Sequence, residues 1–457
     1  MPIRDKGHGR DFKCINHLPD QNWSEATSSN NQSRASRDQS SVFNLTGVLM
    51  GFTVEQECPQ CGAPVELDET DHLLRCPYCD VSSFLFADDY FRFVLPSKAP
   101  NRDLIYFPYL RFKGSAFSCD SHAVRHRIVD ITHLGVPFKR FPVSLGLRPQ
   151  AMKMQFVKSD TEGLFLRCLL KTSDLLARAE KHSSALDSGP VFHRAYIGEA
   201  MNLIYLPLYV EEETLFDGIT NRPIAKLPKD SDIFSSIIDR NPRWGLTFLA
   251  TLCPRCGWNL EGEKDSVVLT CSNCETAWEA KRGRFVNVNL HIAVGGQPDN
   301  AYLPFWKMSV QAKGIKISSY ADFMRTTNQP KVIQKEWENQ DMSFWSPAFK
   351  IRPKLLLYLS RRLTVGQAEL DVKGKFPKKN LYPATLPLSE AIQGIKVTLA
   401  GCAISKKKVI PLLPDISFSI KSASLVYLPF GETVHEMVQL NTHISINKKS
   451  LEFGRYL

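Results

Sequence analysis

Eight of the twelve cysteines fall into two groups with the spacing of a metal site. A Cys-x2-Cys pair supplies two thiolates from one tight turn, and a second pair completes a tetrahedral four-sulfur shell that suits Zn²⁺. Fourteen residues separate the two pairs in each group, which is enough for a short hairpin. Four thiolates leave no open position for water or substrate, so we expect two structural zinc sites. The expected ligands are Cys58, Cys61, Cys76 and Cys79 in the first group, and Cys253, Cys256, Cys271 and Cys274 in the second.

The residues between the cysteine pairs must bring the two turns together. Residues 65–67 and 73–75 have strand character and are predicted to be the two arms of one hairpin, with 68–71 as its turn. Gly62 and Gly257 each follow the second cysteine of a pair, where a left-handed backbone is common. His72 lies in the predicted hairpin, but four thiolates already complete the site, so we do not expect it to be a ligand.

Other patterns that could support catalysis are weaker. His122 and His126 would share one face of a helix, but the glutamate of the His-Glu-x-x-His motif is missing and a strand is equally compatible. Residues 211–213 are three glutamates, which we interpret as a solvated hairpin tip. Because no nucleophile elbow, Walker loop or Gly-x-Gly-x-x-Gly motif is present, we expect no enzyme. A hydrolase using His122, His126 and Asp130 is the alternative.

The net charge of +10 is unevenly distributed along the chain. Residues 51–100 contain 3 Lys/Arg and 9 Asp/Glu, whereas residues 301–457 contain 23 Lys/Arg and 11 Asp/Glu. Affinity for a polyanion depends on cations that displace its counterions, so the first cysteine group is not expected to touch nucleic acid. Nucleic-acid contact is possible through residues 301–457, where Lys307, Lys354, Arg361, Arg362, Lys406, Lys407, Lys408 and the lysines from 373 to 379 are the candidates. Tyr302, Phe305 and Trp306 are aromatic residues of this half that could stack on bases.

Four similar Tyr-x-Pro strings indicate an internal duplication. They begin at Tyr106, Tyr205, Tyr302 and Tyr427, and we expect each proline to mark an edge strand entering a sheet. The cysteine groups lie 195 residues apart and Tyr106 lies 196 residues before Tyr302. An Arg-Pro pair also recurs, at Arg148 and Arg352. The chain is therefore predicted to consist of two related halves.

The predicted fold class is α+β and β-rich, with two zinc ribbons that are each followed by a mixed sheet and helix domain. Helices are predicted within 171–185, 318–327 and 352–363, and antiparallel strands across 395–446. The expected organisation is a disordered leader at 1–49, ribbons at 50–95 and 246–290, and α+β domains at 96–245 and 291–457.

The N-terminal residues and the hydropathy indicate a cytoplasmic protein. Residues 22–41 are rich in Ser, Asn, Gln and Arg, and we hypothesise that translation begins at Met50. There is no apolar run of the roughly 18 residues needed to cross a bilayer and no secretory signal. Thiolate-rich zinc sites also suit a reducing compartment.

The two cysteine groups resemble the zinc-ribbon fold group, in which two Cys-x2-Cys knuckles lie on a short hairpin. The resemblance covers about 30 residues twice and implies a zinc site and a small β fold. The whole arrangement looks like that of bacterial zinc-ribbon proteins from which no activity carries over. We therefore expect a non-catalytic, zinc-binding scaffold or adaptor that acts through protein–protein contacts. The alternative is a nucleic-acid-binding protein that uses its basic C-terminal half.

Overall fold

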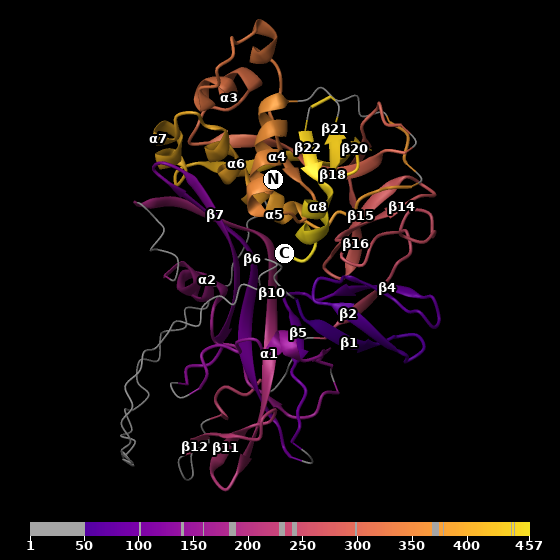
Figure 1. Cartoon of the computed structure of the whole chain (residues 1–457), viewed down its shortest axis with the longest axis vertical. Coiled ribbons are helices and arrows are strands. Elements are labelled where there is room, and N and C mark those ends of the chain that lie inside the picture. The colour runs from indigo at the N-terminus through magenta and orange to yellow at the C-terminus, as the bar shows by residue number, and fades with distance from the viewer. Residues whose placement is uncertain are drawn as a thin grey trace, which may run out of the picture. The chain divides into compact units, whose positions relative to one another are not determined.

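The computed structural model describes residues 51–457, except 100–101, 139–140, 159, 182–188, 228–233, 240–244, 298, 368–373, 378, 440 and 443. The predicted leader at 1–49 therefore lies outside the described residues. The described part is a strand-rich α+β fold, as predicted (Figure 1). None of its helices is both long enough and apolar enough to span a membrane.

A large sheet dominates the first half. Its two long strands are β6 (Ile105–Asp120) and β10 (Val191–Glu211), which pair antiparallel along most of their length. The aromatic run that begins at Ile105 is buried on both faces, which explains why it is apolar without alternation. The remaining strands are β1 (Thr53–Glu57), β2 (Pro64–Asp68), β5 (Phe91–Val94), β7 (Val124–Leu134), β8 (Met154–Phe156), β9 (Leu164–Phe165), β11 (Thr214–Asp217) and β12 (Pro223–Lys226).

The second half has its own sheet, in the order β19-β18-β20-β21-β22 with β17 beside β20. These strands are β17 (Leu290–Ile292), β18 (Ala301–Lys313), β19 (Ser343–Pro347), β20 (Ser417–Glu432), β21 (Glu436–Gln439) and β22 (Ile444–Asn447). Two smaller sheets belong to the cysteine groups: β3 (Leu73–Arg75), β4 (Ser82–Phe86) and β13 (Thr247–Ala250), then β14 (Val268–Cys271), β15 (Thr276–Lys281) and β16 (Arg284–Val288).

Helices cover mainly the second half. The predicted helices are confirmed as α2 (Thr172–Lys181), α3 (Tyr320–Thr327) and α4 (Pro353–Gly366). The short α1 (Arg148–Ala151) has the proline of its Arg-Pro pair as its second residue, and α4 begins at the proline of the other pair. A missing N–H costs no helical hydrogen bond at these positions. The others are η2 (Lys335–Glu338), α5 (Leu388–Gln393), α6 (Ile395–Cys402), α7 (Lys406–Val409), η3 (Ile410–Leu412) and α8 (Lys448–Gly454).

The prediction of strands across 395–446 is wrong for its first third. Residues 395–402 alternate apolar and polar side chains, but they form helix α6, and every residue of it except Lys396 is buried. A helix that is buried on all sides shows no amphipathic period, so its sequence can imitate a strand. Strands begin only at Ser417, with β20.

The four Tyr-x-Pro strings pair with one another in the same register. They lie in β6, β10, β18 and β20, and each tyrosine stands opposite the proline of the facing strand. In the first half the pairs are Tyr106 with Pro207 and Tyr205 with Pro108; in the second they are Tyr302 with Pro429 and Tyr427 with Pro304.

The prediction that these prolines mark edge strands is wrong, because all four strands have neighbours on both sides. Three of the prolines instead fall where the neighbouring strand on one side changes, and Pro304 directly precedes the start of pairing with β19. Along β10, the parallel partner β5 ends opposite Tyr205 and the antiparallel partner β11 begins opposite Leu208, so Pro207 lies in the gap. Proline has no N–H to donate, and a gap between two partners does not need one. β6 and β20 repeat this change of partner around Pro108 and Pro429.

The two halves share a hydrophobic core. Phe117 and Cys119 of β6 and Ala195 and Ile197 of β10 belong to the same buried cluster as the helices and sheet of the second half. The long strands of the first half therefore extend into the core of the second half (Figure 1).

Candidate metal centres

Each cysteine group forms a compact cluster of four sulfur atoms that can hold a metal ion. In the first cluster Cys58 and Cys79 are 3.7 Å apart between their Sγ atoms, and Cys61 and Cys76 are 3.6 Å apart. The second cluster has the matching separations of 3.6 and 3.5 Å. A disulfide would need about 2.05 Å. A tetrahedron of thiolates bound at about 2.3 Å has edges of about 3.8 Å, so the residues fit a tetrahedral metal ion such as Zn²⁺.

All four cysteine turns have the same backbone geometry. The residue after the second cysteine is left-handed in every turn: Gly62 (φ 74°), Asp80 (φ 57°), Gly257 (φ 73°) and Glu275 (φ 55°). The predicted conformation of the two glycines is therefore confirmed. In the first turn the Gly62 amide donates to the carbonyl of Cys58 at 2.9 Å, and Gly257 makes the same bond to Cys253 at 2.8 Å. These turns point both thiols of a pair toward the same point.

The electrostatics of the clusters favours thiolates at specific positions. Burial alone would raise the pKa of Cys253, but the backbone N–H groups of Arg255 and Cys256 outweigh it and lower this pKa to about 6. The N–H groups of Cys79 and Tyr78 likewise overcome burial and lower the pKa of Cys76 to about 7. Metal ions bind the deprotonated thiol, so Cys76 and Cys253 are positions at which the protein favours that form, whereas the pKa values of Cys79 and Cys271 are raised.

The strands between the cysteine pairs do not form the predicted hairpin in the first group. β2 pairs with β1 and β3 pairs with β4, so the arms at 65–67 and 73–75 pair outward rather than with each other. Through β1, which also pairs with β8, the first cysteine group continues the large sheet of the first half. Pairing with β1 buries Val65 and Leu67 on the same face of that sheet as Val54. The sequence alone does not show this pairing.

The two cysteine groups are joined to each other. β13, the strand that leads into the second group, pairs antiparallel with β4 of the first (Figure 1). The Lys264 carbonyl, in the second group, accepts hydrogen bonds from the amides of His72 and Leu73 at 2.8 Å. Leu73 and Phe84 also share a small core with Leu260, Leu269 and Trp278.

The joined groups expose large apolar side chains near their metal-binding turns. Tyr78 is 71% exposed and Val81 38% in the first group, and Trp258 is 57% exposed and Leu252 52% in the second. The pairing of β13 with β4 ends at Ala250 and Ser83, two residues before Leu252 and two residues after Val81. Trp258 is next to Asn259, which bridges to Leu252. We call these four residues the ribbon patch.

A buried ionic cluster fixes the first group to strand β6. Glu69, between the two cysteine turns, forms ion pairs with Arg111 and Lys113, and Arg111 also binds Asp130 at 2.8 Å. Burial opposes ionisation of Glu69, but the charges of Arg111 and Lys113 outweigh it and lower its pKa. The charges of the four groups cancel, so the cluster is a structural contact. The sequence signal for this cluster is the pair of cations two residues apart in an apolar strand, because buried cations require carboxylate partners.

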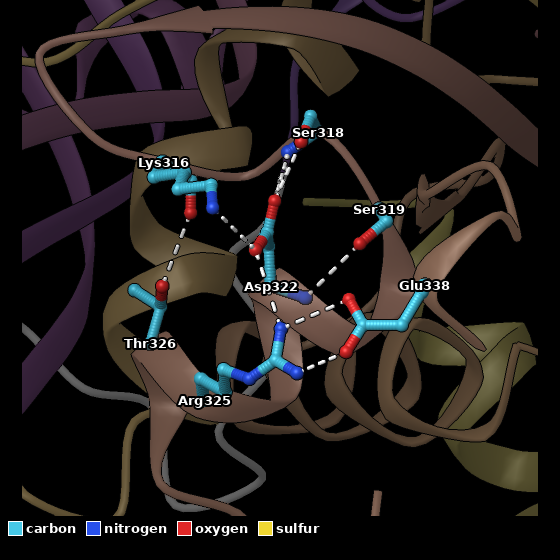
Figure 2. A network of polar contacts seen from close by, with 7 residues as sticks. All are labelled: Lys316, Ser318, Ser319, Asp322, Arg325, Thr326 and Glu338. Atoms are coloured by element: carbon cyan, nitrogen blue, oxygen red, sulfur yellow. Dashed lines mark hydrogen bonds and ion pairs between the residues drawn. The ribbon is translucent and has the colours of Figure 1, made fainter. Parts of the chain in front are cut away.

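A second polar cluster surrounds Asp322 at the start of α3 and is fully satisfied by its neighbours (Figure 2). The Ser318 hydroxyl donates to Asp322 at 2.5 Å and is the largest cause of the lowered pKa of this carboxyl. Lys316 and Arg325 add ion pairs at 3.6 and 3.5 Å. In return, the Asp322 amide donates to Ser319 at 3.2 Å, which caps the helix. This cluster stabilises a helix end and offers no free ligand.

The histidines of the alternative hydrolase site are not brought together. β7 is a strand, so His122, in the turn before it, and His126 do not share a helix face. The His122 Nδ1 atom contacts Ser121 at 2.7 Å, the His126 ring packs against Phe117, and Asp130 binds Arg111. Glu212 and Glu213 both have positive φ in the turn between β10 and β11, which confirms the predicted hairpin tip.

The candidate cations of the second half lie on two different surfaces. Lys354, Arg361 and Arg362 are exposed on α4, and Lys407 and Lys408 are exposed on α7, with Lys406 partly exposed. Lys307 lies in β18 with its Nζ atom 5.7 Å from the centre of the Trp345 ring, which is buried. Phe305 and Trp306 are buried as well, so they cannot stack on bases. In the basic loop, Lys373 and Lys378 lie outside the described residues.

Comparison with known proteins and families finds no match for this chain. No family model matches the chain, and neither curated proteins nor solved structures show significant similarity to it. The functional proposal therefore rests on the residues and their geometry.

Proposed function

We propose that this protein is a non-catalytic, zinc-stabilised scaffold that binds another protein through the ribbon patch. The observation that carries the proposal is the joining of two closed four-cysteine clusters into one unit with exposed apolar side chains. Four thiolates per ion leave no site for substrate, so the metal would act by crosslinking the turns that carry the patch. Exposed apolar residues of this size, next to rigid turns, are typical of protein contact surfaces.

The charge of the first group defines the partner chemistry. Residues 51–100 carry a net charge of −6, and Glu55, Asp68 and Asp88 are exposed there. A partner should therefore present apolar side chains surrounded by cations. A second copy of the same surface would bring two acidic groups together, so we do not propose self-association.

The two halves, in our proposal, are copies of one ancestral unit. The shared register of the Tyr-x-Pro strands supports this, as do the parallel pairings of β5 with β10 and β17 with β20, which both end at the tyrosine of the motif. Duplication would explain why the chain has two zinc ribbons. Only the first of them is acidic.

Affinity capture with matched variants tests the scaffold proposal. A protein recovered by the full-length wild type should be lost with Tyr78→Ser/Trp258→Ser and retained with Val332→Ser/Val434→Ser. The control pair removes two exposed apolar residues (89% and 83% exposed) outside the ribbons. With purified partner, the ribbon variant should bind at least about tenfold more weakly. Equal binding by both variants would refute the proposal. So would a wild-type homodimer, detected by light scattering, that the ribbon variant does not form.

A further inference from the structure

Helices α4 and α7, which both contact α6, carry cations and no carboxylates. Together α4 (Pro353–Gly366) and residues 395–409 contain seven Lys/Arg and no Asp/Glu. Within the described part of the chain, no ion pair joins Lys354, Arg361, Arg362 or the lysines of α7 to a carboxylate. Some cations elsewhere in the structure have a carboxylate partner, as Lys448 has in Glu432 at 2.6 Å. An unneutralised surface of a single sign attracts a polyanion.

The cations of the two helices converge. The Arg361 stem packs directly on Gly401 of α6, where an added Cβ would lie 2.9 Å from the arginine Cδ. α7 begins five residues after Gly401, which brings Lys406 toward Arg361. Burial and then the charge of Arg361 lower the pKa of Lys406, which agrees with two like charges held close together. Their mutual repulsion is a cost that a bound anion would remove.

An aromatic side chain lies among these cations. Tyr358 is 39% exposed and stands four residues after Lys354 and four before Arg362, so the three share one face of α4. Arginine forks bind phosphate in a bidentate manner, and an exposed ring between cations can stack on an unpaired base. Buried Phe305 and Trp306 cannot do this, so Tyr358 takes the role that the sequence assigned to them.

We propose that α4 and α7 form a binding surface for single-stranded nucleic acid, in which Arg361, Arg362 and the α7 lysines contact phosphates and Tyr358 stacks on a base. This site is separate from the ribbon patch and goes beyond the scaffold function. The rival ligand is an anionic membrane, since Ile404 and Leu412 beside the lysines are also exposed, at 56% and 44%. Two aliphatic side chains provide little area for insertion, whereas a tyrosine flanked by cations suits a base.

Fluorescence anisotropy of the full-length protein with a labelled 20-nucleotide oligo(dT) tests the site. With about five phosphate contacts, affinity should fall roughly 100-fold between 50 and 200 mM NaCl. Arg361→Ala/Arg362→Ala and Lys407→Ala/Lys408→Ala should each weaken binding about tenfold at 50 mM NaCl and reduce the salt dependence. Tyr358→Ala should weaken binding by about fivefold or more with the salt dependence unchanged.

The matched control is Lys313→Ala/Lys421→Ala, which removes two exposed lysines of the same half from β18 and β20. It should bind like the wild type. The proposal fails if the wild type does not bind at 50 mM NaCl, or if the control loses as much affinity as the α4 and α7 variants. It also fails if vesicles with 30% phosphatidylserine bind the protein while oligo(dT) does not. Because the Lys407/Lys408 pair is exposed, this variant tests the site even if the arginine variant does not fold.

Discussion

Glu69 forms an ion pair with Arg111 in the interior of the molecule, with side chains that are 2% and 1% exposed. Glu69 belongs to the segment between the cysteine turns, and Arg111 to the central strand of the first half. The pair therefore links the position of the first candidate metal centre to the large sheet.

Replacing Glu69 with glutamine should lower the free energy of unfolding by about 3–5 kcal/mol, because Arg111 and Lys113 would remain charged and buried without full compensation. Urea denaturation of the two proteins measures this difference. The control is Arg102→Ala, which removes the exposed pair of Arg102 with Glu211 and should cost less than about 1 kcal/mol. Similar decreases in the free energy of unfolding for both variants would show that burial of the Glu69 cluster does not increase its contribution to stability.

Metal analysis of the purified protein should find two zinc ions per chain. Cys61→Ser and Cys256→Ser should each remove one ion, because a serine hydroxyl is a poor substitute for a thiolate ligand. The small core common to the two groups predicts that either variant also weakens zinc binding at the other centre. Competition with a chelator measures this coupling. Cys168→Ser, outside both clusters, should keep both ions; a full zinc content in Cys256→Ser would contradict the assignment.

Gly257→Ala should cost about 1–2 kcal/mol although nothing lies within 4 Å of the added methyl group. The reason is conformational, since φ is +73° and a Cβ disfavours that region. Thermal unfolding of the zinc-loaded protein gives the value. Gly366→Ala is the matched control, because the surrounding space is equally open but φ is not left-handed, and its melting temperature should not fall.

Asp71→Asn should stabilise the protein at pH 8 but not at pH 4. Burial raises the pKa of Asp71 to about 6, so between about pH 4 and 6 the folded state holds a proton that the unfolded state has lost. The contribution of protonated Asp71 to the free energy of unfolding is therefore fully present below pH 4 and is lost as the pH rises through 6. The asparagine keeps the acceptor for the Asp68 amide, which bonds Asp71 at 3.0 Å. Unfolding free energies should differ by about 3 kcal/mol at pH 8, and a difference that is independent of pH would refute this.

The cysteine spacing predicted the clusters because ligand sets are local: each pair lies within one turn, and Gly62 and Gly257 mark two of the turns. The strand pairing could not be predicted in the same way. Val65 and Leu67 show that β2 has a buried face, but their alternation does not say whether β2 pairs with β1 or with β3. The buried helix α6 was interpreted as strand because its surroundings, rather than its own pattern, decide its form. Convergence of Arg361 with Lys406 depends on packing against Gly401, which no sequence period reveals.

The pairing of β4 with β13 has a consequence for synthesis on the ribosome. β3 and β4 alone form a two-stranded ribbon, which is marginal in water. The third strand of that sheet follows roughly 160 residues later, so the nascent chain must wait on the order of 10–30 s for it at ordinary elongation rates. During this interval Leu73 and Phe84 lack the neighbours that later cover them. Early capture of a metal ion by Cys58, Cys61, Cys76 and Cys79 would hold this hairpin in place until its partner strand emerges.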